Sequence, residues 1–105
     1  MKLSLTLATL LVLAASGSAF AGDPAGAAQK AGCMACHAVD KKVVGPSFKD
    51  IAAKYKGQGD AVAKLAEKVR KGGAGVWGQI PMPPSPDGKI GDADLKEVVG
   101  WILKL

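Results

Sequence analysis

The feature that most constrains this chain is the run Cys33-Met34-Ala35-Cys36-His37, which has the spacing C-x-x-C-H. It contains both cysteines and the single histidine of the 105-residue chain. Two thiols at this spacing can form thioethers with the two vinyl groups of one porphyrin, and the next residue is then held beneath the iron. Imidazole is a good axial ligand for haem iron. The run therefore predicts one covalent haem c, attached through Cys33 and Cys36 and ligated by His37.

Three other uses of the cysteine pair agree less well with the rest of the chain. A C-x-x-C disulfide closes a very short loop and stabilises a fold little. A thioredoxin-like redox pair lies in a β-α-β pattern, and none surrounds Cys33. A zinc site needs further cysteines or histidines to complete four ligands, and the chain has none.

Residues 1–21 are predicted to be a cleaved secretory signal peptide. Lys2 provides a positive start, residues 3–15 are mainly apolar, and residues 19–21 match an A-x-A cleavage site. The apolar run is short for a membrane-spanning helix, which favours cleavage over anchoring. We therefore expect a periplasmic domain of residues 22–105 that is not inserted in a membrane.

Four helices are expected in this domain, and no segment shows the alternation typical of a β-strand. Asp23-Pro24 and Ser47 are typical of helix starts, and glycines end the second and third helices. The expected helices run from Asp23 to about Gly32, from Ser47 to Gly57, from Asp60 to Gly72, and from Asp92 or Asp94 to Leu105. The fourth is expected to pack against the first. The predicted fold class is all-α, with about four helices around one haem.

The domain has few residues with which to build a core. A domain of this size buries little apolar surface and is marginal without an added staple. Its only aromatic residues are Phe48, Tyr55, Trp77 and Trp101. Something other than side chains is therefore expected to fill the centre.

Met82 is predicted to be the second axial ligand of the iron. Met34 lies between the two cysteines and is poorly placed to reach the opposite haem face. Met82 lies in a Pro-Met-Pro-Pro run on the long connection 72–91, where prolines restrict the backbone. Ligation by histidine and methionine raises the reduction potential. Because protein side chains then fill both axial positions, we expect electron transfer and not catalysis.

Four other residues have two readings each, and the sequence alone leaves them open. The Pro46 carbonyl could accept the second N–H of His37, or Pro46 could simply start a helix. The Trp77 indole could donate to a haem propionate, or Trp77 could be a core residue. Lys68 and Arg70 could pair with propionates or remain solvated.

The positive charge of the domain is modest and dispersed. Lys2 is one of the 14 basic residues, so residues 22–105 carry 13 against 9 acidic ones, a formal charge of +4. No basic block or nucleic-acid reading motif accompanies it, so we expect no nucleic-acid partner. A mild positive field could steer an acidic protein partner.

The chain resembles the class I monohaem cytochromes c, and specifically the short bacterial cytochrome c-551 type, also called cytochrome c8. The matching stretches are residues 32–38, 44–46 and 75–84, and Asp23-Pro24 and Trp101 also fit. The resemblance covers essentially all of residues 22–105. Its most specific part is the run GVWGQIPMPP at residues 75–84.

The resemblance implies a low-spin haem with His37 and Met82 as axial ligands. It also implies that the Pro46 carbonyl accepts from His37 and that Trp77 reaches a propionate. Members of the family shuttle electrons in the periplasm. The implied partners are redox proteins such as a haem-containing nitrite reductase, a terminal oxidase, a cytochrome complex or a photosynthetic reaction centre. A monomer is expected.

Two positions depart from the usual pattern of this family. Lys68 stands where an arginine often bonds a propionate, and Arg70 would face another direction of the helix. Ser85 stands where an asparagine often bonds the methionine sulfur. Because a serine hydroxyl is shorter, the sulfur hydrogen bond and its tuning of the potential remain open.

Overall fold

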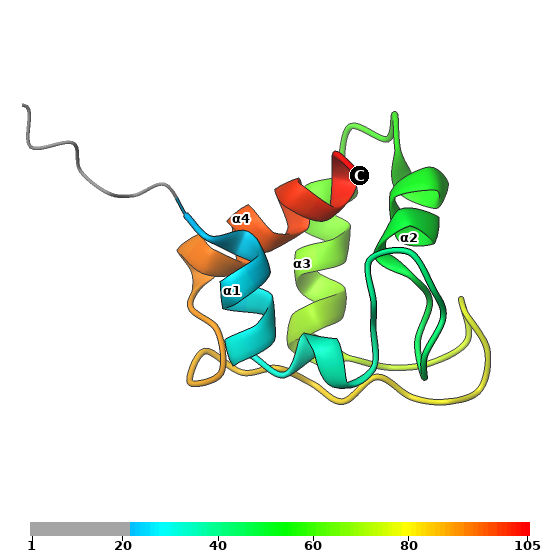
Figure 1. Cartoon of the computed structure of the whole chain (residues 1–105), viewed down its shortest axis with the longest axis horizontal. Helices are drawn as coiled ribbons and strands as arrows, with labels where there is room; N and C mark the ends of the chain where they lie inside the picture. Colours follow the sequence, from blue (N-terminus) through cyan, green and yellow to red (C-terminus); the bar gives the residue numbers. More distant parts are fainter. Residues whose placement is uncertain (1–21) are drawn as a thin grey trace, which may run out of the picture.

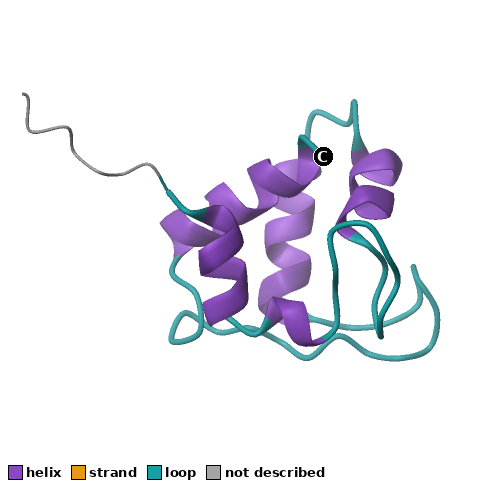
Figure 2. Cartoon of the chain, in the orientation of Figure 1, coloured by secondary structure: helices purple, strands orange, loops and turns teal. Residues whose placement is uncertain are grey.

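The computed structural model describes residues 22–105, so the predicted signal peptide lies outside the described part of the chain. Residues 22–105 form four α-helices and one 3-10 turn, without a β-strand (Figures 1 and 2). In chain order these are α1 (Pro24–Lys30), η1 (Cys33–Ala35), α2 (Phe48–Tyr55), α3 (Ala61–Lys71) and α4 (Asp92–Leu103). The all-α prediction with four helices is confirmed. None of the helices in residues 22–105 is long and apolar enough to cross a membrane.

The first two helices begin where the sequence predicts, and for the predicted reason. The Asp23 carboxylate accepts a hydrogen bond from the N–H of Gly26 at 2.9 Å, and Pro24 is the first residue of α1. At the start of α2, the Ser47 hydroxyl accepts a hydrogen bond from the N–H of Asp50 at 3.0 Å. Both side chains satisfy amides that have no partner within the helix.

Helix α4 is the centre of the fold. It packs against α1, α2 and α3, so the expected packing of the fourth helix on the first is confirmed (Figure 1). Leu95, Val98, Val99 and Ile102 form its buried side. The ring of Phe48, on α2, meets Trp101 edge to face with the centroids 5.6 Å apart. These contacts form the apolar wall on which the site is built.

Two long loops lie on the same side of the molecule. Residues 36–47 connect η1 to α2, and residues 72–91 connect α3 to α4; both curve below α2 in Figure 1. The second loop is fastened to the end of α3 where Gly73 and Met82 pair. Each residue donates its N–H to the carbonyl of the other, at 3.0 and 2.9 Å. The loops and α4 together enclose the site described next.

Candidate haem site

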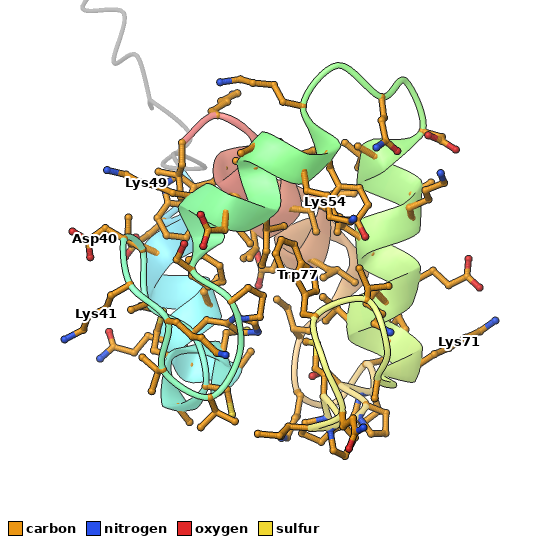
Figure 3. All side chains as sticks on the ribbon, turned by 90° about the vertical axis from the view of Figure 1, so that its right-hand side faces the viewer. Asp40, Lys41, Lys49, Lys54, Lys71 and Trp77 are labelled. Atoms are coloured by element: carbon orange, nitrogen blue, oxygen red, sulfur yellow. The ribbon has the colours of Figure 1, made fainter. Side chains whose placement is uncertain are left out.

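A cavity of about 260 Å³ lies between α4 and the two loops. Its lining is mainly apolar and includes Phe48 of α2, Leu65 of α3 and Val98 of α4. Figure 3 faces this side, with one loop on each side of the opening and Trp77 between them. The attachment and ligand residues predicted from the sequence all line this one cavity: Cys33, Cys36, His37 and Met82.

His37 is buried and oriented by a hydrogen bond. Its Nδ1 lies 2.7 Å from the carbonyl oxygen of Pro46, and only 8% of the residue is exposed. Because a carbonyl oxygen only accepts, the proton of the imidazole must be on Nδ1. The lone pair of Nε2 is then free to bind a metal, which is the arrangement that a ligating histidine requires.

Two neighbours restrict the ring of His37 further. The ring of Phe48 is stacked against it, with the centroids 5.2 Å apart and the planes at 22°. On another side, the backbone of Gly45 is so close that an added Cβ would lie 2.7 Å from Cε1 of the imidazole. The imidazole therefore has little room to turn.

The two cysteines are available for attachment. Cys33 begins η1 and Cys36 follows it, and their sulfurs are not joined in a disulfide. Burial raises the pKa of the Cys33 thiol above its usual value, with a smaller opposing effect from Lys89. The protonated thiol is therefore the main form at neutral pH before any attachment.

Met82 belongs to the opposite loop and is half-buried. Its backbone is fixed by the pairing with Gly73, and Pro81 and Pro83 limit the freedom of the chain on both sides. Met34 does not line the cavity and is 38% exposed. Of the two methionines in the described residues, only Met82 is placed to meet a group bound in the cavity.

Pro46 and Trp77 both line the cavity, together with Lys68. The carbonyl of Pro46 accepts from His37, and Pro46 does not itself start α2, because it precedes Ser47, the N-cap of that helix. The reading of Trp77 as a core residue is wrong, since 41% of it is exposed. The ammonium of Lys54 lies 5.7 Å from the centroid of its ring.

Arg70 and Ser85 lie outside the cavity lining. Arg70 is neither a cavity residue nor a solvated charge, since it bonds to the loop 72–91 and to the start of α4. Ser85 is buried, its N–H donates to the carbonyl of Val69, and its carbonyl accepts from Arg70. Arg70 therefore follows neither reading, because its guanidinium bonds to groups outside the cavity that are 15 to 22 residues away in the chain.

Sequence reasoning gave no role to Phe48, which stacks on His37, or to Lys54, whose ammonium lies near the ring of Trp77; it singled out the Gly45-Pro46 segment without a separate role for Gly45. The Gly45-Pro46 pair did offer a signal. Glycine has no side chain, so it is often found where the backbone must lie close to another group. Phe48 and Lys54 offered none, since their roles depend on how α2 is placed over the two loops.

The residues around the cavity fit a covalently held haem. Two free thiols lie on one side with an imidazole whose Nε2 is available, and a thioether lies on the opposite loop. Imidazole and thioether are both ligands of haem iron, and an apolar lining suits the porphyrin plane.

Comparisons with known proteins agree with this geometry. The family model described as cytochrome c matches residues 24–105. The chain is 56% identical over 81 residues to cytochrome c2 of Rubrivivax gelatinosus, and the aligned segment covers 77% of this chain and 95% of that protein. It is 48% identical over 99 residues to cytochrome c-552 of Nitrosomonas europaea, and this alignment covers 94% of each protein.

A solved structure shares the fold. The crystal structure of wild-type Nitrosomonas europaea cytochrome c552 matches with a TM-score of 0.72 and 54% sequence identity. The match covers 77% of this chain and 98% of the other.

Proposed function

The chain belongs to the class I monohaem cytochromes c, small electron carriers with covalently bound haem c, and we propose that His37 and Met82 are its axial ligands. The resemblance to small class I monohaem cytochromes c is confirmed by the relatives named above. We assign the two thioethers to Cys33 and Cys36. The observation that carries the proposal is that these four side chains line one apolar cavity from two facing loops.

Each residue has a defined task in this proposal. When bound, haem iron supplies reversible one-electron oxidation and reduction. His37 presents Nε2 because its Nδ1–H is committed to Pro46, which also fixes the orientation of the ring. The Met82 sulfur is a soft donor that favours ferrous iron and a high potential. Apolar residues of α4 exclude water from the centre.

Trp77 and Lys68 are proposed to meet the haem propionates at the edge of the cavity. Both line it, and the two side chains carry an indole N–H and an ammonium, which are suitable donors for carboxylates. Ser85 lies outside the lining, which argues against a hydrogen bond from its hydroxyl to the Met82 sulfur.

The protein is proposed to act as a carrier and not as an enzyme. If the imidazole of His37 and the thioether of Met82 both held the iron, no position would be left for a substrate. A haem protein with an open position would instead bind carbon monoxide readily, and a dithiol oxidoreductase would lack haem altogether.

We place this carrier in the periplasm, after cleavage of residues 1–21. The support is the positive start, the apolar run and the A-x-A pattern of those residues. The proposed partners are redox proteins such as a nitrite reductase, a terminal oxidase, a cytochrome complex or a reaction centre. Such encounters are weak and transient.

Two measurements on protein purified from its own host test the proposal. Haem that stays on the polypeptide under denaturing, reducing conditions is expected, and its loss would exclude the thioethers. The reduced and oxidised spectra are expected to show low-spin iron that does not bind carbon monoxide. High-spin iron with ready carbon monoxide binding would refute ligation by Met82.

A further inference from the structure

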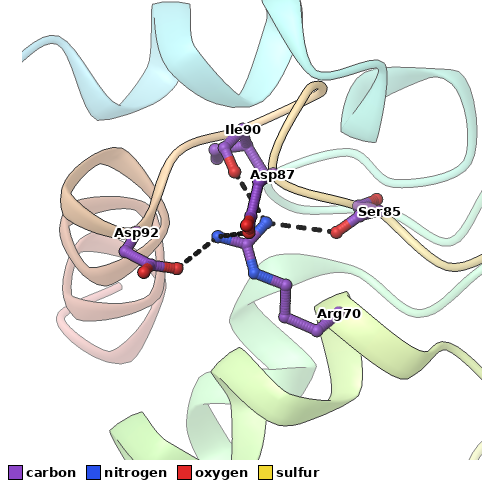
Figure 4. A network of polar contacts seen from close by, with 5 residues as sticks. All are labelled: Arg70, Ser85, Asp87, Ile90 and Asp92. Atoms are coloured by element: carbon purple, nitrogen blue, oxygen red, sulfur yellow. Dashed lines mark hydrogen bonds and ion pairs between the residues drawn. The ribbon is translucent and has the colours of Figure 1, made fainter.

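Arg70 is held by more polar partners than any other side chain in the described residues. It is the second-last residue of α3, and 21% of its side chain is exposed. One guanidinium nitrogen donates to the carbonyl oxygens of Ser85 at 3.2 Å and Ile90 at 2.6 Å (Figure 4). The other pairs with the carboxylates of Asp92 at 2.6 Å and Asp87 at 3.2 Å.

The bonds to the two carbonyls matter more than the ion pairs. The side chains of Asp87 and Asp92 are 85% and 89% exposed, so solvent screens their attraction for the guanidinium. The hydrogen bonds to the carbonyls of Ser85 and Ile90 are part-buried and have a charged donor, which makes them stronger than neutral ones. These two bonds fasten both ends of the segment 85–90 to α3.

Ser85 is connected to Met82 by a short and stiff stretch of chain. Only Pro83 and Pro84 lie between them, and each proline has a fixed φ. Met82 is paired with Gly73, and the N–H of Ser85 donates to the carbonyl of Val69 at 2.9 Å. A shift of Ser85 would therefore be passed on to Met82 rather than absorbed by a flexible linker.

We infer that Arg70 is a positioning residue for Met82. It anchors the chain that follows the methionine, so that the sulfur is held at a fixed place in the cavity. This inference rests on the proposed ligation of iron by Met82. It goes beyond that proposal because Arg70 does not line the cavity and would act only through the loop.

The test compares three variants of the haem-loaded ferric protein. Arg70→Met removes all the donors, and Arg70→Lys keeps the charge with a shorter reach. Lys71→Met is the matched control, because Lys71 is the next residue and, within the described residues, its exposed ammonium pairs with Glu67 on the same helix alone. Imidazole is titrated in, since it binds iron only when the methionine sulfur has moved away, and urea unfolding is measured in parallel.

The expected result is a local effect at the iron. Arg70→Met should bind imidazole about tenfold more tightly than the unmodified protein, which corresponds to about 1.4 kcal/mol. The imidazole affinity of Arg70→Lys should lie between those of Arg70→Met and the unmodified protein. The affinity of Lys71→Met should stay within about twofold of the unmodified protein, because the surface ion pair of Lys71 contributes little to stability.

Two results would overturn the inference while leaving the proposed function intact. One is an imidazole affinity of Arg70→Met equal to that of Lys71→Met. The other is a loss of urea stability in Arg70→Met without a change in imidazole affinity, which would mean a purely structural role. Should Arg70→Met not fold, the comparison of Arg70→Lys with the control decides. An unmodified protein whose spectrum lacks methionine ligation would instead refute the proposed function.

Discussion

His37 shows how closely a single side chain is specified by its neighbours. A hydrogen bond to Pro46 fixes its tautomer, the ring of Phe48 covers one face, and Gly45 touches its edge. Each neighbour limits a different freedom of the imidazole: the position of the proton, the tilt of the ring and its lateral movement. The geometry of the proposed iron bond is therefore set before the haem is attached.

Gly45→Ala tests how tightly the imidazole is enclosed. The added Cβ would lie 2.7 Å from Cε1 and 3.0 Å from Nδ1 of His37, so the ring or the loop must move. We expect the free energy of unfolding of the haem-loaded protein to fall by about 1–3 kcal/mol, as in other overpacked sites. Urea denaturation followed by haem absorbance measures it.

Gly59→Ala is the control for this substitution. A Cβ at Gly59 meets no atom within 4 Å, and its φ is outside the left-handed region. Its free energy of unfolding should stay within about 0.5 kcal/mol of the unmodified value. Equal free energies of unfolding for the two variants would show that the loop around His37 shifts at little energetic cost.

Met82→Ala tests the second axial ligand. Loss of the soft sulfur should lower the potential by on the order of 0.1–0.3 V, a part of the roughly 0.8 V that axial ligands span. The vacated position should also bind added imidazole or carbon monoxide. Redox titration and ligand titration measure the two effects. Met34→Ala is the control, because Met34 is outside the cavity. An unchanged potential in Met82→Ala would rule out Met82 as the second axial ligand.

The residues near the haem could be predicted to the extent that their chemistry is local in sequence. Cys33, Cys36 and His37 lie within five consecutive residues, and Met82 is the one methionine of residues 22–105 that lies outside this run. Trp77 could not be placed, because an isolated tryptophan looks the same in sequence whether it donates to a propionate or packs in the core. Arg70 could not be placed either, since its partners, Ser85, Ile90 and Asp92, come together only in the folded chain.

At the scale of elements, the helix starts followed from short-range chemistry. Asp23 and Ser47 lie three residues before the amides that they cap, so their effect is visible in the sequence. The carboxylate of Asp60 behaves differently, because it pairs with Lys64 at 3.3 Å and does not cap α3. The turn η1 and the pairing of Gly73 with Met82 were not predicted, since a single turn and a two-residue bridge have no periodicity.

Ser47→Ala tests the start of α2, the helix that carries Phe48 onto His37. The variant leaves the N–H of Asp50 without its partner and should reduce the free energy of unfolding by about 1 kcal/mol. Urea denaturation at matched m-values measures the change. Lys49→Ala is an exposed control on the first turn of the same helix and should stay within about 0.5 kcal/mol. A loss no greater than that of the control would mean that packing alone holds this end of α2.

For the whole molecule, the number of helices could be predicted but most of their arrangement could not. Periodicity indicates which side of each helix is apolar, and four amphipathic helices can meet in several ways. The packing of α4 on α1 was expected, whereas its contacts with α2 and α3 were not predicted. The cavity explains this ambiguity, because the apolar sides of the helices line it as well as pack on one another.

The distribution of charge leads to a prediction about encounters with partners. Lys42 and Lys68 line the cavity and Lys54 lies over Trp77, so positive charge surrounds the opening. Electron transfer to an acidic partner should slow several-fold as ionic strength rises from about 0.01 to 0.2 M, because the screening length shortens. Stopped-flow kinetics measure this rate.

Two charge-neutralising variants locate the effect. Lys42→Gln should weaken the salt dependence of the rate, and Lys104→Gln, on the C-terminal side of α4, should leave it unchanged. A response of Lys104→Gln equal to that of Lys42→Gln would show that net charge, and not the opening, guides the encounter.

The dependence of the fold on its cofactor is tested by replacing Cys33 and Cys36 together with alanine. Among the described residues the buried apolar core is small, and its largest side chains, such as Phe48, Leu95 and Ile102, border the cavity rather than fill it. Without attached haem, these side chains would face water or collapse into a different packing. A domain of this size has little stability to lose before it unfolds. We therefore expect the double variant to lose most of its helical circular dichroism at 25 °C, while Met34→Ala, which keeps both thiols, retains it. A haem-free double variant with a native-like helical spectrum and cooperative unfolding would mean that the four helices hold their arrangement by themselves.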